Sequence, residues 1–238
     1  MPPEPAPTAW TILQALGLLL LVYGPVVALV LVLRRRLRLT PFEGRRLPRS
    51  RLLLAAYVGE ERARAAIPDL QPEELALPAE PTGISRFEAW ALGLQRWGKE
   101  ADVRALIALG QHALPVWRSR WPEDSRLVAA LQAAIDWVRC PTPENYRAAH
   151  EAGYVVLCIP DAEHMEEGAL DFAPARARNL FQIVAARAGS NSPNHVGVWW
   201  GAPLAAELTS EEAVREVIRA ALVPWALGEG DPLADVRA

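Results

Sequence analysis

The segment RLVAALQAAIDWV, residues 126–138, has the clearest structural pattern in the chain. Its apolar residues recur at intervals of three and four positions, which places them on one face of an α-helix. These residues are Leu127, Val128, Leu131, Ala134, Ile135 and Val138. Asp124 and Ser125 precede the run and are candidate N-caps. The segment therefore predicts an amphipathic helix with one buried face.

The same period predicts helices on both sides of this segment. Toward the N-terminus they cover residues 87–97 and 103–117, and Pro115 is expected to end or kink the second because proline has no amide hydrogen to donate. Toward the C-terminus, Thr142 and Pro143 have the residue types of an N-cap and a first helical position. We expect Gly153 to end the helix that they begin.

Two more helices are predicted near the C-terminus. Residues 180–188 predict one that ends at Gly189. Residues 214–222 predict the other, and Thr209 with Glu212 has the spacing of a capping box for it.

Residues 154–159 (YVVLCI) and 195–200 (HVGVWW) break the helical period. Both runs are short, and runs of this length fit a strand or a buried helix. Two strands at these places could pair with each other. We predict an all-α fold and leave a minor two-strand element open.

Residues 9–33 form an almost unbroken apolar run, in which Tyr23 is the only ionisable side chain. About 20 apolar residues suffice for a helix to cross a bilayer. No Lys or Arg precedes the run and arginines follow it, which disfavours a cleaved signal peptide. We predict a single transmembrane helix, kinked at Pro25 because proline interrupts helical hydrogen bonding.

The charges on the two sides of this run give its orientation. Only Glu4 carries charge on the N-terminal side, whereas eight arginines follow the run. These are Arg34, Arg35, Arg36, Arg38, Arg45, Arg46, Arg49 and Arg51. The positive-inside rule then puts residues 1–8 outside the inner membrane and the C-terminal domain in the cytoplasm.

The basic segment over residues 34–66 has two interpretations. Arg34, Arg35, Arg36 and Arg38 are candidate lipid-contact residues, because each basic residue near an anionic surface contributes about 1 kcal/mol. A short helix containing residues 52–57 would then lie along the headgroups. Alternatively, the arginines only fix the topology.

Four prolines follow between residues 67 and 84, a composition typical of a semi-rigid spacer. We predict a linker there, with a helical turn at Pro72. The predicted globular domain covers residues 85–228, enough for one core, and residues 229–238 form a tail.

The charge of the part that follows the arginines restricts its partners. From residue 52 onward the chain has 17 of its 25 basic residues and 26 of its 28 acidic ones, a formal charge of −9. Nucleic-acid binding is disfavoured, because it depends on clustered Lys and Arg. A basic partner suits this charge better.

Cys140, His150, Cys158 and His164 are the clustered candidates for metal binding. None of them makes the close pair that zinc sites use. No catalytic motif is present, and we predict no cofactor, no metal and no catalytic residue. An enzyme or sensor with a site around His150 and His164 is the alternative.

The chain has nine tryptophans, and Trp199, Trp200 and Trp121 are not explained by the inward-facing helical patterns. Tryptophan is enriched at interaction hot spots. Trp199 and Trp200 follow a polar loop and are our best candidates for a surface that contacts a partner; both could also pack beneath that loop.

Residues 114–138, LPVWRSRWPEDSRLVAALQAAIDWV, contain a P-x-D-x-R turn before an alanine-rich helix that ends in tryptophan. The matching residues are Pro122, Asp124, Arg126 and Trp137, and a second alanine-containing helix follows around residues 147–149. This part resembles a family of helical immunity proteins, whereas the apolar anchor and the part after Tyr154 do not. The resemblance implies a protein that neutralises a toxin by binding it.

Together these features predict a membrane-anchored, non-catalytic module that binds another protein, such as a toxin or a subunit of a membrane complex. A structural subunit of a membrane assembly is a further alternative.

Overall fold

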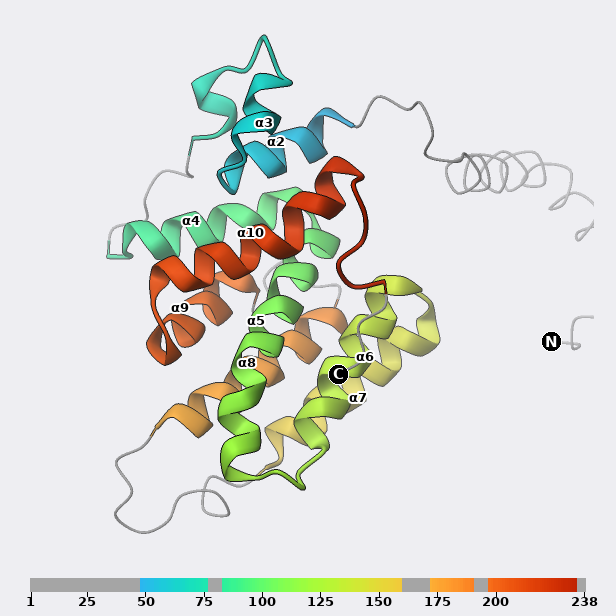
Figure 1. Cartoon of the computed structure of the whole chain (residues 1–238). Coiled ribbons are helices and arrows are strands. Elements are labelled where there is room, and N and C mark those ends of the chain that lie inside the picture. Colours follow the sequence, from blue (N-terminus) through green and yellow to red (C-terminus); the bar gives the residue numbers. More distant parts are fainter. Residues whose placement is uncertain (1–47, 77–82, 160–171, 191–196, 235–238) are drawn as a thin grey trace, which may run out of the picture. The chain divides into compact units, whose positions relative to one another are not determined.

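The computed structural model describes residues 48–76, 83–159, 172–190 and 197–234, which all belong to one compact unit, Leu47–Ala238 (Figure 1). Every regular element in these ranges is a helix. The all-α prediction is confirmed for this part of the chain. The two-strand alternative is wrong where the structure describes it, because Tyr154 lies in the last turn of one helix and Val198 begins another.

The elements follow one another along the chain in two groups. The N-terminal ones are α2 (Arg49–Tyr57), α3 (Glu61–Ala65), the 3-10 helix η1 (Pro72–Glu74), α4 (Arg86–Leu94) and the 3-10 helix η2 (Gln95–Trp97). The others are α5 (Lys99–Arg120), α6 (Arg126–Arg139), α7 (Pro143–Leu157), α8 (Ala173–Ala188), α9 (Val198–Leu208) and α10 (Glu211–Leu227).

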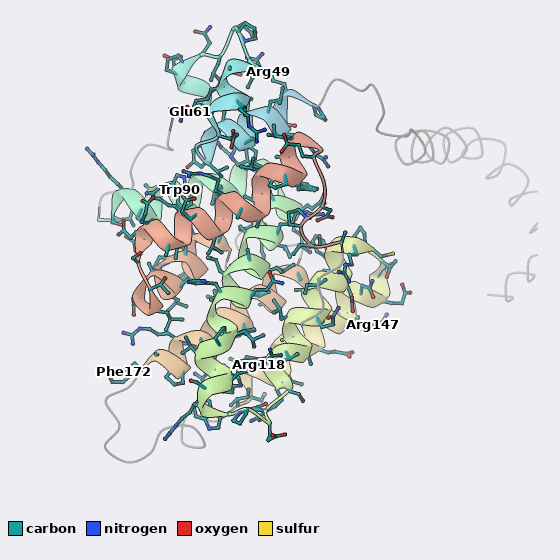
Figure 2. All side chains as sticks on the ribbon, in the orientation of Figure 1. Arg49, Glu61, Trp90, Arg118, Arg147 and Phe172 are labelled. Atoms are coloured by element: carbon teal, nitrogen blue, oxygen red, sulfur yellow. The ribbon has the colours of Figure 1, made fainter. Side chains whose placement is uncertain are left out.

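Helices α5 and α8 pack against each other at the centre of the domain (Figure 1). α6 and α7 pack on α8 from one direction and α9 from another, and α9 also contacts α4. α10 packs on α5 and α2. It also lies beside α4, where the Arg215 guanidinium stacks 4.3 Å from the centre of the Trp90 ring (Figure 2). The core is therefore shared by helices far apart in sequence.

The sequence pattern located several helices closely. α6 buries the predicted face, and Leu127, Leu131 and Ile135 are completely buried. Of its two candidate N-caps, Asp124 accepts a hydrogen bond from the Arg126 amide at 3.0 Å, while the Ser125 side chain caps nothing. The predictions for the start of α7 and the end of α8 are also confirmed.

Three predicted helix boundaries are wrong. α5 continues through Pro115 to Arg120, so this proline does not end the helix, while the kink stays a prediction. α7 continues past Gly153 to Leu157, and a Cβ at Gly153 would lie 3.3 Å from the Ala185 Cβ, so this glycine allows α7 and α8 to approach closely. The N-cap of α10 is Ser210, whose hydroxyl accepts from the Ala213 amide at 3.1 Å, and not Thr209.

The packed core begins earlier in the chain than residue 85. Leu54 and Tyr57 of α2 are buried, and the Tyr57 hydroxyl donates a hydrogen bond to the Trp90 carbonyl at 2.7 Å. Because these side chains are buried in the domain, they are not available to contact lipid headgroups. Residues 49–57 thus form part of the domain and differ from the predicted headgroup helix.

Part of the predicted linker is also attached to the domain. Ile67 is buried, and Arg49 forms ion pairs with Asp69 at 2.9 Å and Glu74 at 2.8 Å. The Arg96 guanidinium donates to the Ala76 carbonyl at 2.9 Å. The predicted turn at Pro72 is present as η1.

The predicted transmembrane helix, residues 9–33, and the arginines at positions 34–46 lie outside the described residues. Within the ranges given above, no helix combines the length and the apolar character that crossing a bilayer requires.

Candidate binding site

After Val198, the inward face of α9 is made of small residues. Gly201, Ala202 and Ala205 are buried, and a Cβ at Gly201 would lie only 2.6 Å from the Leu106 Cδ2 and 3.0 Å from the Leu180 Cδ1. Helix α9 therefore approaches α5 and α8 more closely than a larger residue would permit. Trp199, Trp200 and Leu204 of α9 are only partly buried or exposed.

Trp199 and Trp200 lie on the outward side of α9, in its first turn. Their ring centres are 4.8 Å apart, and the rings are tilted by 58°. Trp199 is partly buried, while Trp200 is 50% exposed. Exposed tryptophan of this extent is unusual enough to need an explanation, because burying an aromatic ring contributes strongly to stability.

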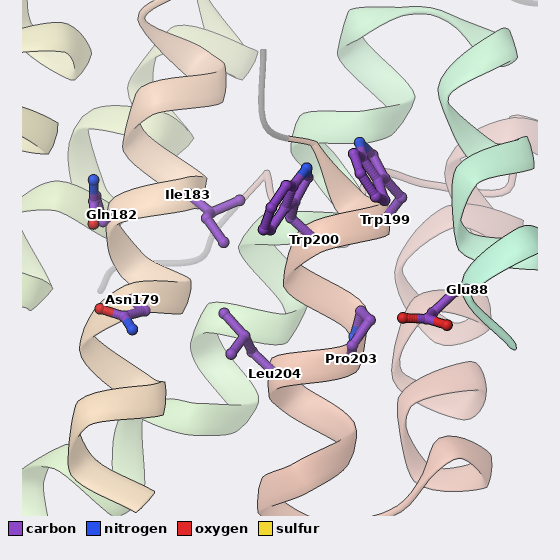
Figure 3. A pocket seen from close by; sticks show the side chains of 8 residues that line it. All are labelled: Glu88, Asn179, Gln182, Ile183, Trp199, Trp200, Pro203 and Leu204. Atoms are coloured by element: carbon purple, nitrogen blue, oxygen red, sulfur yellow. The ribbon is translucent and has the colours of Figure 1, made fainter. Parts of the chain in front are cut away.

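The two tryptophans line a pocket of about 530 Å³ that extends over α9 from α4 to α8 (Figure 3). The residues that line it are Glu88, Asn179, Gln182, Ile183, Trp199, Trp200, Pro203 and Leu204. Figure 3 shows Trp200 beside Ile183, with Leu204 one turn below. The size falls in the range of about 300–1,000 Å³ that is usual for binding sites.

Polar groups lie at both sides of this apolar surface. Glu88 extends from α4 toward Pro203, and Asn179 and Gln182 belong to α8 on the other side of α9 (Figure 3). One Glu88 carboxylate oxygen accepts from the Ser85 amide at 2.7 Å, while the Glu88 amide donates to the Ser85 hydroxyl. This capping box holds Glu88 in place. Asn179 accepts hydrogen bonds from the Arg178 guanidinium through its side-chain oxygen.

A buried ion pair fixes the start of α9. The Asp102 carboxylate of α5 accepts from the Val198 amide at 2.7 Å and from the Arg187 guanidinium of α8. Asp102 is completely inaccessible and Arg187 almost so. Burial raises the pKa of Asp102, while the Val198 amide and Arg187 oppose that shift. Three helices therefore meet at one carboxylate beside the tryptophan pair.

Lys99, the only lysine in the chain, occupies a different junction. Its ammonium group donates to the Ala188 carbonyl at the end of α8 at 2.7 Å and lies 4.1 Å from the centre of the Trp137 ring. Burial and the nearby Arg187 charge lower the pKa of Lys99 to about 8. The contacts tie α5, α6 and α8 together.

Trp121 does not join the predicted tryptophan surface. It stacks on Trp117 with ring centres 4.3 Å apart and lines a separate hollow of about 590 Å³, formed by residues 120–126. Those residues include Pro122, Asp124 and Arg126, and the Arg126 guanidinium forms a 2.8 Å ion pair with Asp124. The turn that carried the family resemblance is thus well defined.

The candidate metal ligands do not gather. Cys140 and Cys158 are exposed at opposite ends of α7, and at about 1.5 Å per residue the 15-residue helix keeps them roughly 20 Å apart. His150 is exposed on α7, and His164 lies outside the described residues. No group of three potential metal ligands occurs in the described part of the chain.

Most of the pocket was missing from the sequence-based prediction. Glu88, Asn179, Gln182 and Leu204 are far apart in sequence, and no motif connects them. One usable signal was present, because Gly201, Ala202 and Ala205 mark an inward face of small residues and therefore turn Trp199 and Trp200 outward.

Comparisons with models of known protein families, with curated proteins and with solved structures found no match. The resemblance to helical immunity proteins therefore stays a prediction, and the arguments below rest on the pocket and its residues.

Proposed function

We propose that this chain is a single-pass inner-membrane protein whose cytoplasmic helical domain binds another protein through the pocket on α9. The observation that carries the proposal is the outward placement of Trp199 and Trp200 beside Leu204 and Ile183. Interaction hot spots are enriched in tryptophan and concentrate in well-packed apolar pockets.

The rest of the chain supplies the setting for this proposal. The apolar run over residues 9–33 and the arginines that follow it support an anchor with the domain on the cytoplasmic side. Extraction of membranes at alkaline pH tests the anchor. Release of the full chain into the soluble fraction would contradict it.

The partner class is a protein, and the resemblance of residues 114–138 favours a toxin within that class. Affinity purification of the full chain from detergent-solubilised membranes tests the binding. We expect a stoichiometric partner that is lost when Leu204→Glu places a charge in the pocket.

A matched control is available on α7. Tyr154 is 63% exposed and does not line the pocket, so Tyr154→Glu should retain the partner. Equal loss in both variants, or retention in both, would contradict binding through the α9 pocket.

A further inference from the structure

The distribution of polar groups around the α9 pocket indicates what kind of protein segment it takes. This inference rests on the function proposed above. Neighbouring packed helices lie about 8–10 Å apart, and α4 packs on α9, which packs on α8. Two such spacings set an upper limit of roughly 16–20 Å on the distance from the Glu88 side of the pocket to the Asn179 side.

That breadth suits a peptide segment. An extended chain advances about 3.3 Å per residue, so five or six residues would cover the pocket from one side to the other. The Gln182 amide can donate and accept, and the Asn179 amide nitrogen can donate while its oxygen accepts from Arg178; these groups match the backbone of such a segment. The apolar surface of Trp200, Ile183 and Leu204 between the polar groups accommodates one apolar side chain (Figure 3).

The α4 side of the pocket has a fixed negative charge. The capping box with Ser85 orients the Glu88 side chain, and the charged end of Glu88 lines the pocket. The whole part from residue 52 onward is also acidic, with a formal charge of −9. The net negative charge of this part and the local Glu88 carboxylate thus both favour a positively charged partner.

We propose that the pocket binds an extended segment of a partner protein that presents an apolar anchor side chain and, about three residues away, an arginine or lysine. The anchor packs on Trp200 and Leu204, and the basic side chain pairs with Glu88. The separation corresponds to the distance of about one helix spacing between the centre of the pocket and α4.

A phage-displayed library of random twelve-residue peptides tests this inference without knowledge of the partner. The full chain in lipid nanodiscs is the bait, and the Leu204→Glu variant in the same nanodiscs removes peptides that bind elsewhere. Selected peptides are then synthesised, and their affinities are measured by calorimetry. We expect an apolar residue accompanied by Arg or Lys at a spacing of about three.

The role of Glu88 is tested with Glu88→Gln, because glutamine also forms a capping box and so removes the charge without removing the cap. We expect a selected peptide to bind this variant about two- to fivefold more weakly, as for a partly exposed ion pair. Its Arg→Ala analogue should bind wild type and variant equally. Glu151→Gln, an exposed acid on α7 away from the pocket, should leave both affinities unchanged.

Two outcomes would overturn the inference, and they differ in what else they reject. Peptides that need Leu204 but carry no basic residue, or that ignore Glu88→Gln, would reject the basic partner and leave the proposed binding function standing. If no selected peptide distinguishes wild type from Leu204→Glu, the pocket does not bind an extended segment and the inference fails; the proposed function fails with it when Leu204→Glu also retains the partner in the affinity purification.

Discussion

Helices α6 and α9 belong to the same core but bury opposite kinds of side chain. α6 buries Leu127, Leu131 and Ile135 completely, whereas most of the buried residues of α9 are small, and its Trp200 is half exposed. Burying large apolar groups stabilises a helix against its neighbours. The small residues of α9 instead let its backbone approach α5 and α8 closely, and Trp200 is left half exposed at the surface. Under the function proposed above, α6 serves the fold and α9 serves recognition.

The largest expected loss of stability comes from breaking the contact that attaches α9 to α5 and α8. Asp102→Ala leaves Arg187 buried without its carboxylate and removes the acceptor of the Val198 amide. Loss of one partner of a buried ion pair costs about 3–5 kcal/mol, and we expect that loss in the free energy of unfolding. Denaturant titration of the full chain in detergent, followed by circular dichroism, measures it.

Glu100→Ala is the control for this prediction. Glu100 is two residues away, is largely exposed and pairs with Arg104 at 3.2 Å, so its loss should cost at most about 1 kcal/mol. Equal stabilities of the two variants would mean that Asp102 does not hold α9 in place.

One substitution made in both helices tests the comparison directly. Leu131→Ala in α6 removes a completely buried side chain and should cost about 2–5 kcal/mol in unfolding free energy. Leu204→Ala in α9 removes a partly exposed pocket side chain and should cost less than about 1.5 kcal/mol while weakening peptide binding. Parallel denaturation of both variants checks this. A larger loss at Leu204 would reject the division between fold and recognition.

The small inward face of α9 gives the third prediction. Gly201→Val places methyl groups against Leu106 and Leu180, whose methyl carbons lie within 3.0 Å of the position that a Cβ would take. Overpacking of this kind costs about 1–3 kcal/mol. Thermal unfolding of the variant measures the loss, and the double variant with Leu106→Ala tests its cause. The double variant should lose less stability than the sum of the single losses, because removal of the Leu106 side chain makes space.

The same two helices explain how far the sequence could predict the fold. The period of large apolar residues in α6 located its start, its end and its buried face, because such residues nearly always face a core. In α9 the run HVGVWW has no such period, since the inward face is built from glycine and alanine. Its helical state depends on packing against α5 and α8, which a local pattern does not contain.

The candidate site was predictable only in part, for a related reason. Trp199 and Trp200 could be singled out by residue type alone. Glu88 and Asn179 gain their place in the pocket when α4 and α8 pack on α9, so no spacing in the sequence relates them. Likewise, Asp102 lies within an apolar helical stretch, and its partner Arg187 is 85 positions away.

The smallest expected effect is a pH dependence of stability that comes from Lys99, the residue that lies on Trp137 of α6. Trp137 of α6 is covered by the Lys99 ammonium at 4.1 Å, whereas Trp200 of α9 is half exposed. Burial lowers the pKa of Lys99 to about 8 from 10.5, so between these values the unfolded chain binds more protons than the folded one. Stability should therefore rise with pH in this window. Lys99→Met should remove the rise.

Denaturation midpoints at several values between pH 8 and pH 10 measure this effect. Above that window Tyr57 interferes, because burial raises its pKa from 10.0 to about 12, and stability then falls as pH rises. A fall below pH 10 that depends on Lys99 would reverse the prediction. It would mean that the Trp137 ring and the Ala188 carbonyl hold the charged amine more strongly than burial disfavours it. Trp137 would then be a ring already covered by the chain's own cation, whereas Trp200 stays half exposed and available to an apolar side chain of a partner.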